Sequence, residues 1–225
     1  MHQFYHSFIN LVFIGIIALF PVINPIGSAF IVSPYFLNLN NKEKRKVVQK
    51  VCLYAFLICV VSLFAGQWIL KLFGISIPII QLAGGIMICK IGWEFLSADK
   101  STQIKVNSAE LENADEGYEH LAGKLFYPIS FPITTGPGTI SVLFTLSAHS
   151  ATDNMNSYLV NTLALLVSVL VICILIYIFY FNTKTMIHFL GENGENIVNR
   201  ISAFLIFCVG LQIAFTGLKV LFNFW

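Results

Sequence analysis

Charged residues are scarce in this chain. Only 11% of its 225 residues are Asp, Glu, Lys or Arg, and 57% are hydrophobic, whereas soluble domains carry about 25% charged residues. So little charge cannot cover the surface of a soluble protein, and the excess apolar surface must therefore face lipid. Because the apolar segments are long enough for helices to cross a bilayer, the composition predicts an all-α integral membrane protein.

Other features are absent altogether. The sequence has no C-x-x-C pair, no nucleotide-binding loop and no clustered metal ligands, so we expect no cofactor, no metal site and no nucleic-acid partner, and we do not expect an enzyme. No Asp or Glu lies in the middle of an apolar segment, which disfavours a proton pump built on carboxylates. The N-terminus lacks the basic region of a secretory signal, so we expect the first span to be retained.

Six apolar segments have the length of about 20 residues that a transmembrane helix needs. They cover residues 8–37, 49–70, 72–96, 124–148, 157–181 and 197–221. As a straight helix the first would be about 45 Å long, well beyond the hydrocarbon thickness of about 30 Å. A break inside this helix would remove the mismatch.

Basic residues gather on one side of the predicted membrane topology. Lys71 and Lys219 lie on one side, and Lys90 lies within the third span. The other ten of the 13 lysines and arginines follow spans one, three and five: Lys42, Lys44, Arg45, Lys46, Lys50, Lys100, Lys105, Lys124, Lys184 and Arg200. Since positive residues favour the cytoplasmic side, we expect three cytoplasmic loops and both termini in the periplasm.

Two segments with paired prolines interrupt the predicted spans, Phe20–Gly27 in the first and Phe131–Gly138 in the fourth. Proline lacks an N–H group and clashes with the preceding helical turn, so both helices should break near the membrane midplane. Backbone groups freed inside a membrane need protein or a water-filled cavity to satisfy them. Two breaks at matching places are typical of the binding site of a secondary transporter.

The two segments also indicate an internal repeat, since Phe20 and Phe131 lie 111 residues apart. Residues 98–123 are polar and acidic, and we expect a cytoplasmic linker there, between a first repeat (1–97) and a second (124–225). With three spans each, the two repeats must be inverted relative to one another. Gly92 and Gly210 also correspond, and we expect these small residues to let helices approach closely.

At this level of detail the sequence resembles the MarC family of bacterial inner-membrane proteins. The matching motifs cover nearly the whole chain: Asn24-Pro25-Ile26-Gly27, Gly74 to Pro78, Ala83-Gly84-Gly85, Thr135 to Ile140, and Gly191 through Arg200 to Gly210. The resemblance implies six spans with broken helices one and four. It also implies membership of a wider group that includes neutral amino-acid transporters.

The chemistry of the two segments suits a small zwitterion. The N-terminus of a half-helix attracts a carboxylate, and the carbonyls of an interrupted C-terminus suit an ammonium group or a coupling ion such as Na+ or H+. Glycines let the backbone approach a ligand, and neutral side chains add hydrogen bonds. The predicted substrate-binding residues are Asn24, Pro25, Gly27, Thr134, Thr135, Gly136, Pro137 and Gly138.

Each of these features also has a simpler reading. Paired prolines can be ordinary kinks, and the chain can be a membrane scaffold or assembly protein with no solute pathway. Lys90 and Glu94 lie four residues apart near the end of the third span. They can form a local ion pair at the interface, or act as a gate.

Overall fold

The computed structural model describes residues 2–36, 39–97, 118–150 and 155–222, and no strand occurs within these ranges. The elements, in chain order, are α1 (His2–Ile23), α2 (Pro25–Val32), the 3-10 helix η1 (Ser33–Phe36), α3 (Asn41–Phe73), α4 (Ile77–Ser97), α6 (Tyr118–Lys124), the π-type helix η2 (Leu125–Thr134), α7 (Pro137–Ser150), α8 (Met155–Phe181) and α9 (Thr183–Leu221).

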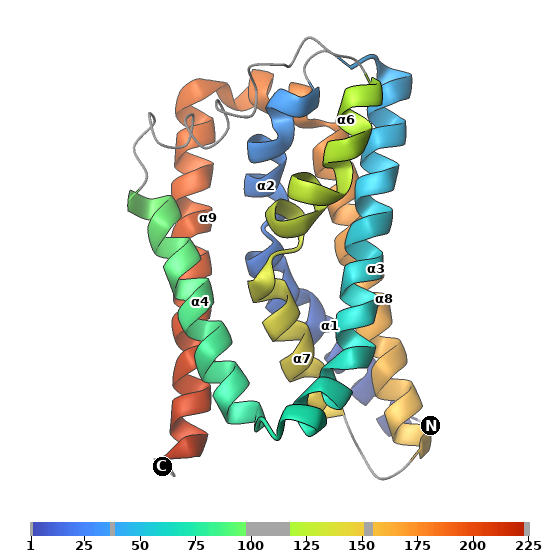
Figure 1. Cartoon of the computed structure of the whole chain (residues 1–225), viewed down its shortest axis with the longest axis vertical. Coiled ribbons are helices and arrows are strands. Elements are labelled where there is room, and N and C mark those ends of the chain that lie inside the picture. Colours follow the sequence, from blue (N-terminus) through green and yellow to red (C-terminus); the bar gives the residue numbers. More distant parts are fainter. Residues whose placement is uncertain (1, 37–38, 98–117, 151–154, 223–225) are drawn as a thin grey trace.

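Five stretches of this all-helical fold are long and apolar enough to cross a membrane. They are Phe8–Phe36, Asn41–Gly66, Ile77–Glu94, Met155–Phe181 and Ala203–Leu221. A bent pair, Leu121–Thr134 with Pro137–Ser147, makes a sixth if it is counted as one span. The long helices run roughly along one axis, and the two chain ends lie at the same end of the bundle (Figure 1).

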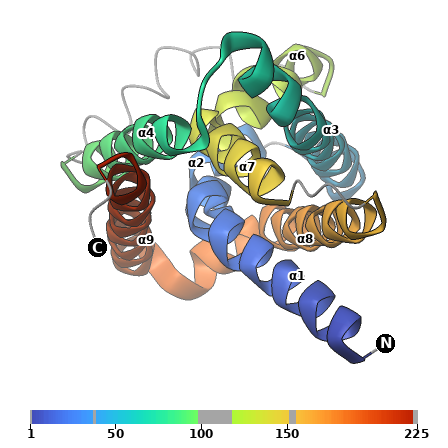
Figure 2. The same cartoon turned by 90° about the horizontal axis from the view of Figure 1, so that it is seen from below.

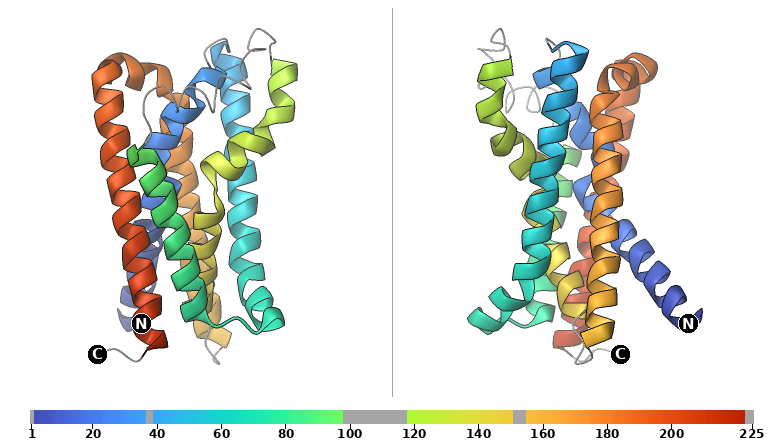
Figure 3. Two further views of the ribbon diagram at one scale, coloured as in Figure 1. Left: turned by 60° about the vertical axis from the view of Figure 1, so that its left-hand side comes forward. Right: turned by 90° about the vertical axis from the view of Figure 1, so that its right-hand side faces the viewer.

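The bundle has a centre and two flanking helix pairs. The α1–α2 and η2–α7 segments run through the middle, with α3 and α8 on one side and α4 and α9 on the other (Figures 1 and 2). The N-terminal part of α1 leans away from the other helices, and the first part of α9 crosses the end of the bundle before the helix turns to run along α4 (Figure 3). The two interrupted segments therefore lie between the two flanking pairs, although each still exposes large side chains, such as Ile17 of α1 and Tyr127 of η2.

The α4–α9 pair packs through glycines. A Cβ atom built on Gly85 would lie 2.6 Å from the Gly210 carbonyl oxygen, and one on Gly210 would lie 2.9 Å from the Gly85 oxygen. One on Gly92 would lie 2.6 Å from the backbone nitrogen of Phe207. Close approach of small residues is how helices associate where lipid removes the hydrophobic drive, and the expectation of close packing at Gly92 and Gly210 is confirmed.

The main core lies between the central segments and the α3–α8 pair. Val47, Val51, Leu165, Val169 and Ile172 are at most 1% exposed there. The outward faces of the same two helices expose large apolar side chains: Leu53, Leu57, Val61, Leu163, Leu170, Ile174 and Ile178. A helix that is apolar all round is typical of a membrane span, so the burial pattern agrees with the composition.

The structure corrects the sequence analysis at the start of α3. The second span was expected from residue 49, with the basic residues before it in a loop. Helix α3 instead begins at Asn41, because Asn40 accepts N–H bonds from Lys42 and Glu43 while the Glu43 side chain accepts the Asn40 N–H in return. This capping box makes the stretch from Lys42 to Lys50 helical.

The expected linker over 98–123 is only partly described. Residues 98–117 lie outside the described ranges, and Tyr118–Lys124 forms α6, so the last part of that segment is helical.

Candidate functional site: two helix interruptions

The first interruption lies between α1 and α2, at Asn24. This residue has φ 46° and ψ 65°, in the left-handed region, which asparagine tolerates because its short side chain can bond locally. Pro25 follows and has no N–H to continue the bonding of α1, while its fixed φ suits the first residue of a new helix. The new N-terminus of α2 lies about halfway along the bundle (Figure 1).

The Asn24 side chain closes this interruption. The Gly27 N–H donates to Asn24 Oδ1 at 3.1 Å. The N–H and the hydroxyl of Ser28 both donate to the Asn24 carbonyl, at 2.9 and 2.8 Å. A Cβ atom on Gly27 would collide with the Asn24 amide. In this structure Gly27 therefore makes room for a capping side chain, at the place where we expected the backbone to approach a ligand.

The second interruption lies between η2 and α7. Tyr127 (φ −120°, ψ 125°) and Phe131 (φ −130°, ψ 124°) have extended backbone inside η2, as expected for residues that precede a proline. Thr135 follows with φ −123° and ψ 84°, and α7 begins at Pro137. The chain direction changes by 63° across this break.

Three buried hydroxyls stabilise the irregular turns of η2. Ser130 Oγ donates to the Leu125 carbonyl at 2.6 Å, Thr134 Oγ1 to the Ile129 carbonyl at 2.7 Å, and Thr135 Oγ1 to the Ser130 carbonyl at 2.7 Å. Each bond reaches a carbonyl five residues back in the chain. With their protons donated in this way, Thr134 and Thr135 can offer a ligand only acceptor lone pairs.

Gly136 and Gly138 lie at points of close packing. A Cβ atom on Gly136 would lie 3.0 Å from the Pro132 carbonyl oxygen. One on Gly138 would lie 2.9 Å from Ile88 Cγ1 on α4 and 3.2 Å from Val22 Cγ1 in the last turn of α1. The start of α7 is therefore packed against the end of α1, and the two interruptions are neighbours.

Tyr180 of α8 joins the two interruptions. Its side chain is fully buried, its hydroxyl oxygen lies 2.8 Å from Thr134 Oγ1, and the hydroxyl also interacts with the Ser28 side chain. Since Ser28 bonds to the Asn24 carbonyl, one phenol reaches residues of both interruptions. A continuous set of polar contacts thus connects α2, α8 and η2.

Lys44 extends the same set toward one end of the bundle. It is 3% exposed, and it is the one buried charged side chain among residues whose burial the structure describes. Its Nζ donates to Thr183 Oγ1 at 2.7 Å, and the Thr183 hydroxyl donates to the Tyr180 carbonyl at 3.1 Å. The ammonium also lies 5.8 Å from the ring centroid of Phe36 and 6.0 Å from that of Phe181, within the range of cation–π attraction.

Thr139 differs from these residues. It is the third residue of α7 and is 1% exposed, yet its Oγ1 has no hydrogen-bond partner among the described residues. Buried hydroxyls are normally paired, and an unpaired one costs about 1–3 kcal/mol. The site therefore contains one polar group whose bonding is incomplete.

Comparison with known proteins agrees with this membrane architecture. The MarC family, whose members are described as integral membrane proteins, matches residues 9–222. The chain belongs to the MarC family. The relative named UPF0056 inner membrane protein MarC from Escherichia coli strain Crooks is 28% identical over 212 residues, which covers 91% of this chain and 92% of the relative. The protein of the same name from Salmonella arizonae is 28% identical over 208 residues, with the same coverage of each chain. No solved structure matches.

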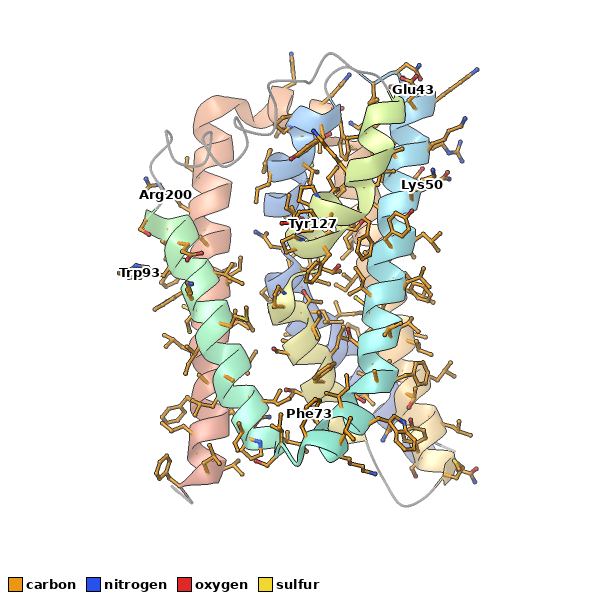
Figure 4. The ribbon with its side chains drawn as sticks, in the orientation of Figure 1. Glu43, Lys50, Phe73, Trp93, Tyr127 and Arg200 are labelled. Carbon is orange, nitrogen blue, oxygen red and sulfur yellow. The ribbon has the colours of Figure 1, made fainter. Side chains whose placement is uncertain are left out.

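In this MarC-family protein, Lys90 and Glu94 lie away from the interruptions. Lys90 Nζ is 3.7 Å from Glu94 Oε1, and the two side chains are 74% and 60% exposed. Trp93, between them in the sequence, points outward from α4 (Figure 4). The two residues form an exposed ion pair, and their role as a gate stays a prediction.

Three residues of the MarC-family site were missed by sequence reasoning. Tyr180 carried a usable signal, because a tyrosine deep in an apolar span needs a partner for its hydroxyl. Lys44 was taken as one of several topology-directing charges, and the sequence does not reveal that it alone is buried among those that the structure describes. Thr139 entered the sequence analysis only as part of the motif from Thr135 to Ile140, and the sequence does not reveal that its hydroxyl lacks a partner among the described residues.

Proposed function

We propose that this chain is a secondary transporter of small neutral zwitterions, most simply amino acids, in the bacterial inner membrane. One observation carries the proposal. Two helix interruptions, 111 residues apart in the sequence, meet about halfway along the bundle and share Tyr180 as a common contact. A scaffold needs no such pair, whereas transporter sites are built from interrupted helices at a repeat interface.

The packing pattern supports two inverted repeats. The α1–α2 segment packs on α8, and the η2–α7 segment packs on α3. Helix α2 contacts α9, and α7 contacts α4. The remaining pairs, α3 with α8 and α4 with α9, map onto themselves when the two halves are exchanged. This relation is the one expected of three-span repeats, 1–97 and 124–225, that are inserted in opposite directions.

The electrostatics of the interruptions favour a zwitterion over an ion of single charge. The N-termini of α2 and α7 carry the positive ends of helix dipoles, which favour a carboxylate. Pro25 and Pro137 have no N–H to give to the carbonyls four residues earlier, Pro21 and Ile133, and such carbonyls suit an ammonium group. Both charges of an amino acid can thus be met without a buried ionised side chain beside it.

The same proposal includes an orientation. The basic residues Lys42, Arg45 and Lys46 lie in the first turns of α3, at the end of the bundle opposite to both termini (Figure 1). The positive-inside rule puts that end in the cytoplasm and the termini in the periplasm. The names of the relatives, which are called inner membrane proteins, support a location in the inner membrane. Na+ and H+ both remain candidates for the coupling ion.

Exchange of labelled alanine in proteoliposomes that contain only this protein tests the proposal. We expect saturable exchange that unlabelled small neutral amino acids inhibit. Gly138→Leu should abolish it, since the added side chain meets Ile88 and Val22. Gly123→Leu is the matched control and should retain exchange, because a Cβ atom at Gly123 meets nothing within 4 Å. Folded protein that exchanges no neutral amino acid would favour the scaffold instead.

A further inference from the structure

We infer that Thr139, together with the first turn of α7, binds the carboxylate group of the transported solute. This inference rests on the proposed transport function, which it sharpens by assigning one end of the ligand to one end of one helix. Thr139 was not among the residues expected to bind substrate. The group it would take is a carboxylate of a small zwitterion such as alanine.

The hydroxyl of Thr139 is free to bind a ligand. Thr139 is buried, and its Oγ1 has no partner among the described residues. The three hydroxyls just before it all donate to carbonyls of η2. Its counterpart in the first repeat, Ser28, donates to the Asn24 carbonyl. Thr139 is therefore the one hydroxyl of this group with a donor still free.

Helix geometry sets the direction of the Thr139 side chain. In an α-helix each Cα–Cβ bond tilts toward the N-terminus. Thr139 is the third residue of the 14-residue helix α7, so its side chain leans toward the first turn of that helix. Pro137 has no N–H, and the N–H groups of Thr139 and Ile140 both donate to the Gly136 carbonyl, at 3.0 and 3.3 Å. The start of α7 therefore offers an anion its dipole and the Thr139 hydroxyl, and not a row of free N–H groups. The free hydroxyl and the positive end of the α7 dipole thus lie in the same place.

The N-terminus of α7 decides whether the bound group is negative or positive. A hydroxyl alone can donate to a carboxylate or accept from an ammonium. The helix N-terminus decides between them, because its dipole attracts an anion and repels a cation. Apolar side chains pack nearby, since Ile88 and Val22 contact the position of Gly138. A low-dielectric wall of this kind strengthens the attraction between the dipole and a carboxylate.

The two repeats are unequal in this respect. At the N-terminus of α2 the Gly27 N–H is already bonded to Asn24 Oδ1, so that end supplies its own acceptor. At the N-terminus of α7 the residue directly before Pro137 is Gly136, which has no side chain to act as a cap. Thr135, which matches Asn24 at the offset of 111 residues, donates its hydroxyl to the Ser130 carbonyl instead. A ligand carboxylate at α7 would take the place that the Asn24 amide oxygen takes at α2.

The test compares alanine with alaninamide, in which a neutral amide replaces the carboxylate. Binding is followed by the thermal stability of the purified full-length protein in detergent, titrated with each compound. The variants are Thr139→Val, which keeps the shape but loses the hydroxyl, Thr139→Ser, which keeps the hydroxyl, and Thr145→Val. Thr145 is a matched control on the same helix, since its hydroxyl already donates to the Ser141 carbonyl at 3.0 Å.

We expect alanine to bind the unchanged protein at least tenfold more tightly than alaninamide. Thr139→Val should weaken alanine binding by about tenfold to hundredfold, the value of a hydrogen bond to a charged group. It should weaken alaninamide binding by less, about twofold to tenfold, because the amide oxygen accepts the same bond without a charge. Thr139→Ser and Thr145→Val should bind alanine as the unchanged protein does. Without ligand, Thr139→Val should be no less stable, because it removes an unpaired polar group.

Two results would overturn the inference, and they are distinguishable. If the unchanged protein binds and exchanges alanine but Thr139→Val does so equally well, the carboxylate binds elsewhere and the transport proposal survives. A hydroxyl that bonds only to water would give this result. If the unchanged protein neither binds nor exchanges any small neutral amino acid, the transport proposal fails, and the carboxylate site fails with it.

Discussion

The two helix interruptions are made of similar residues but satisfy their backbone in different ways. At the first, Asn24 alone supplies the irregular backbone and also caps the next helix through Gly27. At the second, the irregular backbone extends from Tyr127 to Gly136, and the hydroxyls of η2 bond back to carbonyls five residues earlier. The first break closes on itself within five residues, whereas the second leaves Thr139 unpaired.

This difference indicates that the first interruption has a structural role and that the second is the better candidate for binding a ligand. The first interruption is short, and it sets the direction of α2 while leaving few backbone N–H and C=O groups without hydrogen bonds. A longer one with incomplete bonding is the better place to receive a ligand, because a ligand there gains hydrogen bonds that the protein does not already make. The two breaks lie next to each other, and their different local sequences give them different hydrogen bonds.

The largest effect is expected from Gly27→Ala. The new Cβ atom would occupy the place of the Asn24 amide, so the cap must open. Loss of a cap costs about 0.5–2 kcal/mol, and the displaced, partly buried Asn24 amide loses its bond to Gly27, which adds about 1–3 kcal/mol. We therefore expect a clear fall in thermal stability in detergent and loss of alanine exchange.

A double variant sharpens this prediction. In Asn24→Gly the amide is absent, so adding Gly27→Ala should cost much less than it does in the unchanged protein. Strong non-additivity of this kind is expected only for residues in direct contact. Equal costs in both backgrounds would mean that Gly27 is needed for another reason, such as contact with a solute.

Tyr180→Phe should have the next largest effect. The phenol hydroxyl contacts Thr134 and Ser28, and its loss leaves buried polar groups with one partner fewer, at about 1–3 kcal/mol. Because this residue links the two interruptions, alanine exchange should fall together with stability. Tyr177→Phe is the control, since Tyr177 lies on the same helix, is only half-buried and stacks on Phe181. Equal effects of the two changes would show that the bridge has no special role.

Lys44→Met tests whether the buried ammonium stabilises the contact between α3 and the start of α9. Methionine keeps the apolar stem but loses the bond to Thr183 and the attraction to the rings of Phe36 and Phe181. We expect a loss of about 1–2 kcal/mol in unfolding free energy, against no measurable change for the exposed Lys46→Met. A more stable Lys44→Met protein would mean that desolvation of the charge outweighs its contacts.

These variants test features that could be predicted from the sequence to different degrees. The paired prolines indicated where α1 and η2 end, because the missing N–H and the ring clash are properties of proline itself. The positions of the spans could also be predicted, because the length of an apolar segment is read directly from the sequence. The start of α3 could have been predicted from Asn40 and Glu43, which form a capping box. It was missed because the basic residues around Glu43 were assigned to a loop. The partners of Tyr180, Lys44 and Thr139 could not be read, because they depend on helices far apart in the sequence.

A smaller effect is expected where only the cap is altered. Asn24→Gly removes the side-chain acceptor but adopts a positive φ without strain, so it should cost a few tenths of a kcal/mol. Asn24→Ala loses the same acceptor and also strains the left-handed backbone, which adds about 1–2 kcal/mol. The difference between the two variants, measured by thermal unfolding, separates backbone strain from capping. If both variants cost the same, the left-handed conformation of Asn24 is not what defines the first break.

The smallest effect is expected from Glu94→Gln. The Lys90–Glu94 pair is mostly exposed, and an i,i+4 pair of this kind is worth about 0.3–0.5 kcal/mol. It lies on the outer surface of α4, away from the interruptions that the other predictions address. We therefore expect unchanged alanine exchange and a barely measurable change in stability, with the same result for Lys90→Gln. If Glu94→Gln stopped exchange in a protein that unfolds at the same temperature, the pair would have to act in the transport cycle. The solute pathway would then include a third element beside the two interruptions, one that becomes enclosed only in another conformation.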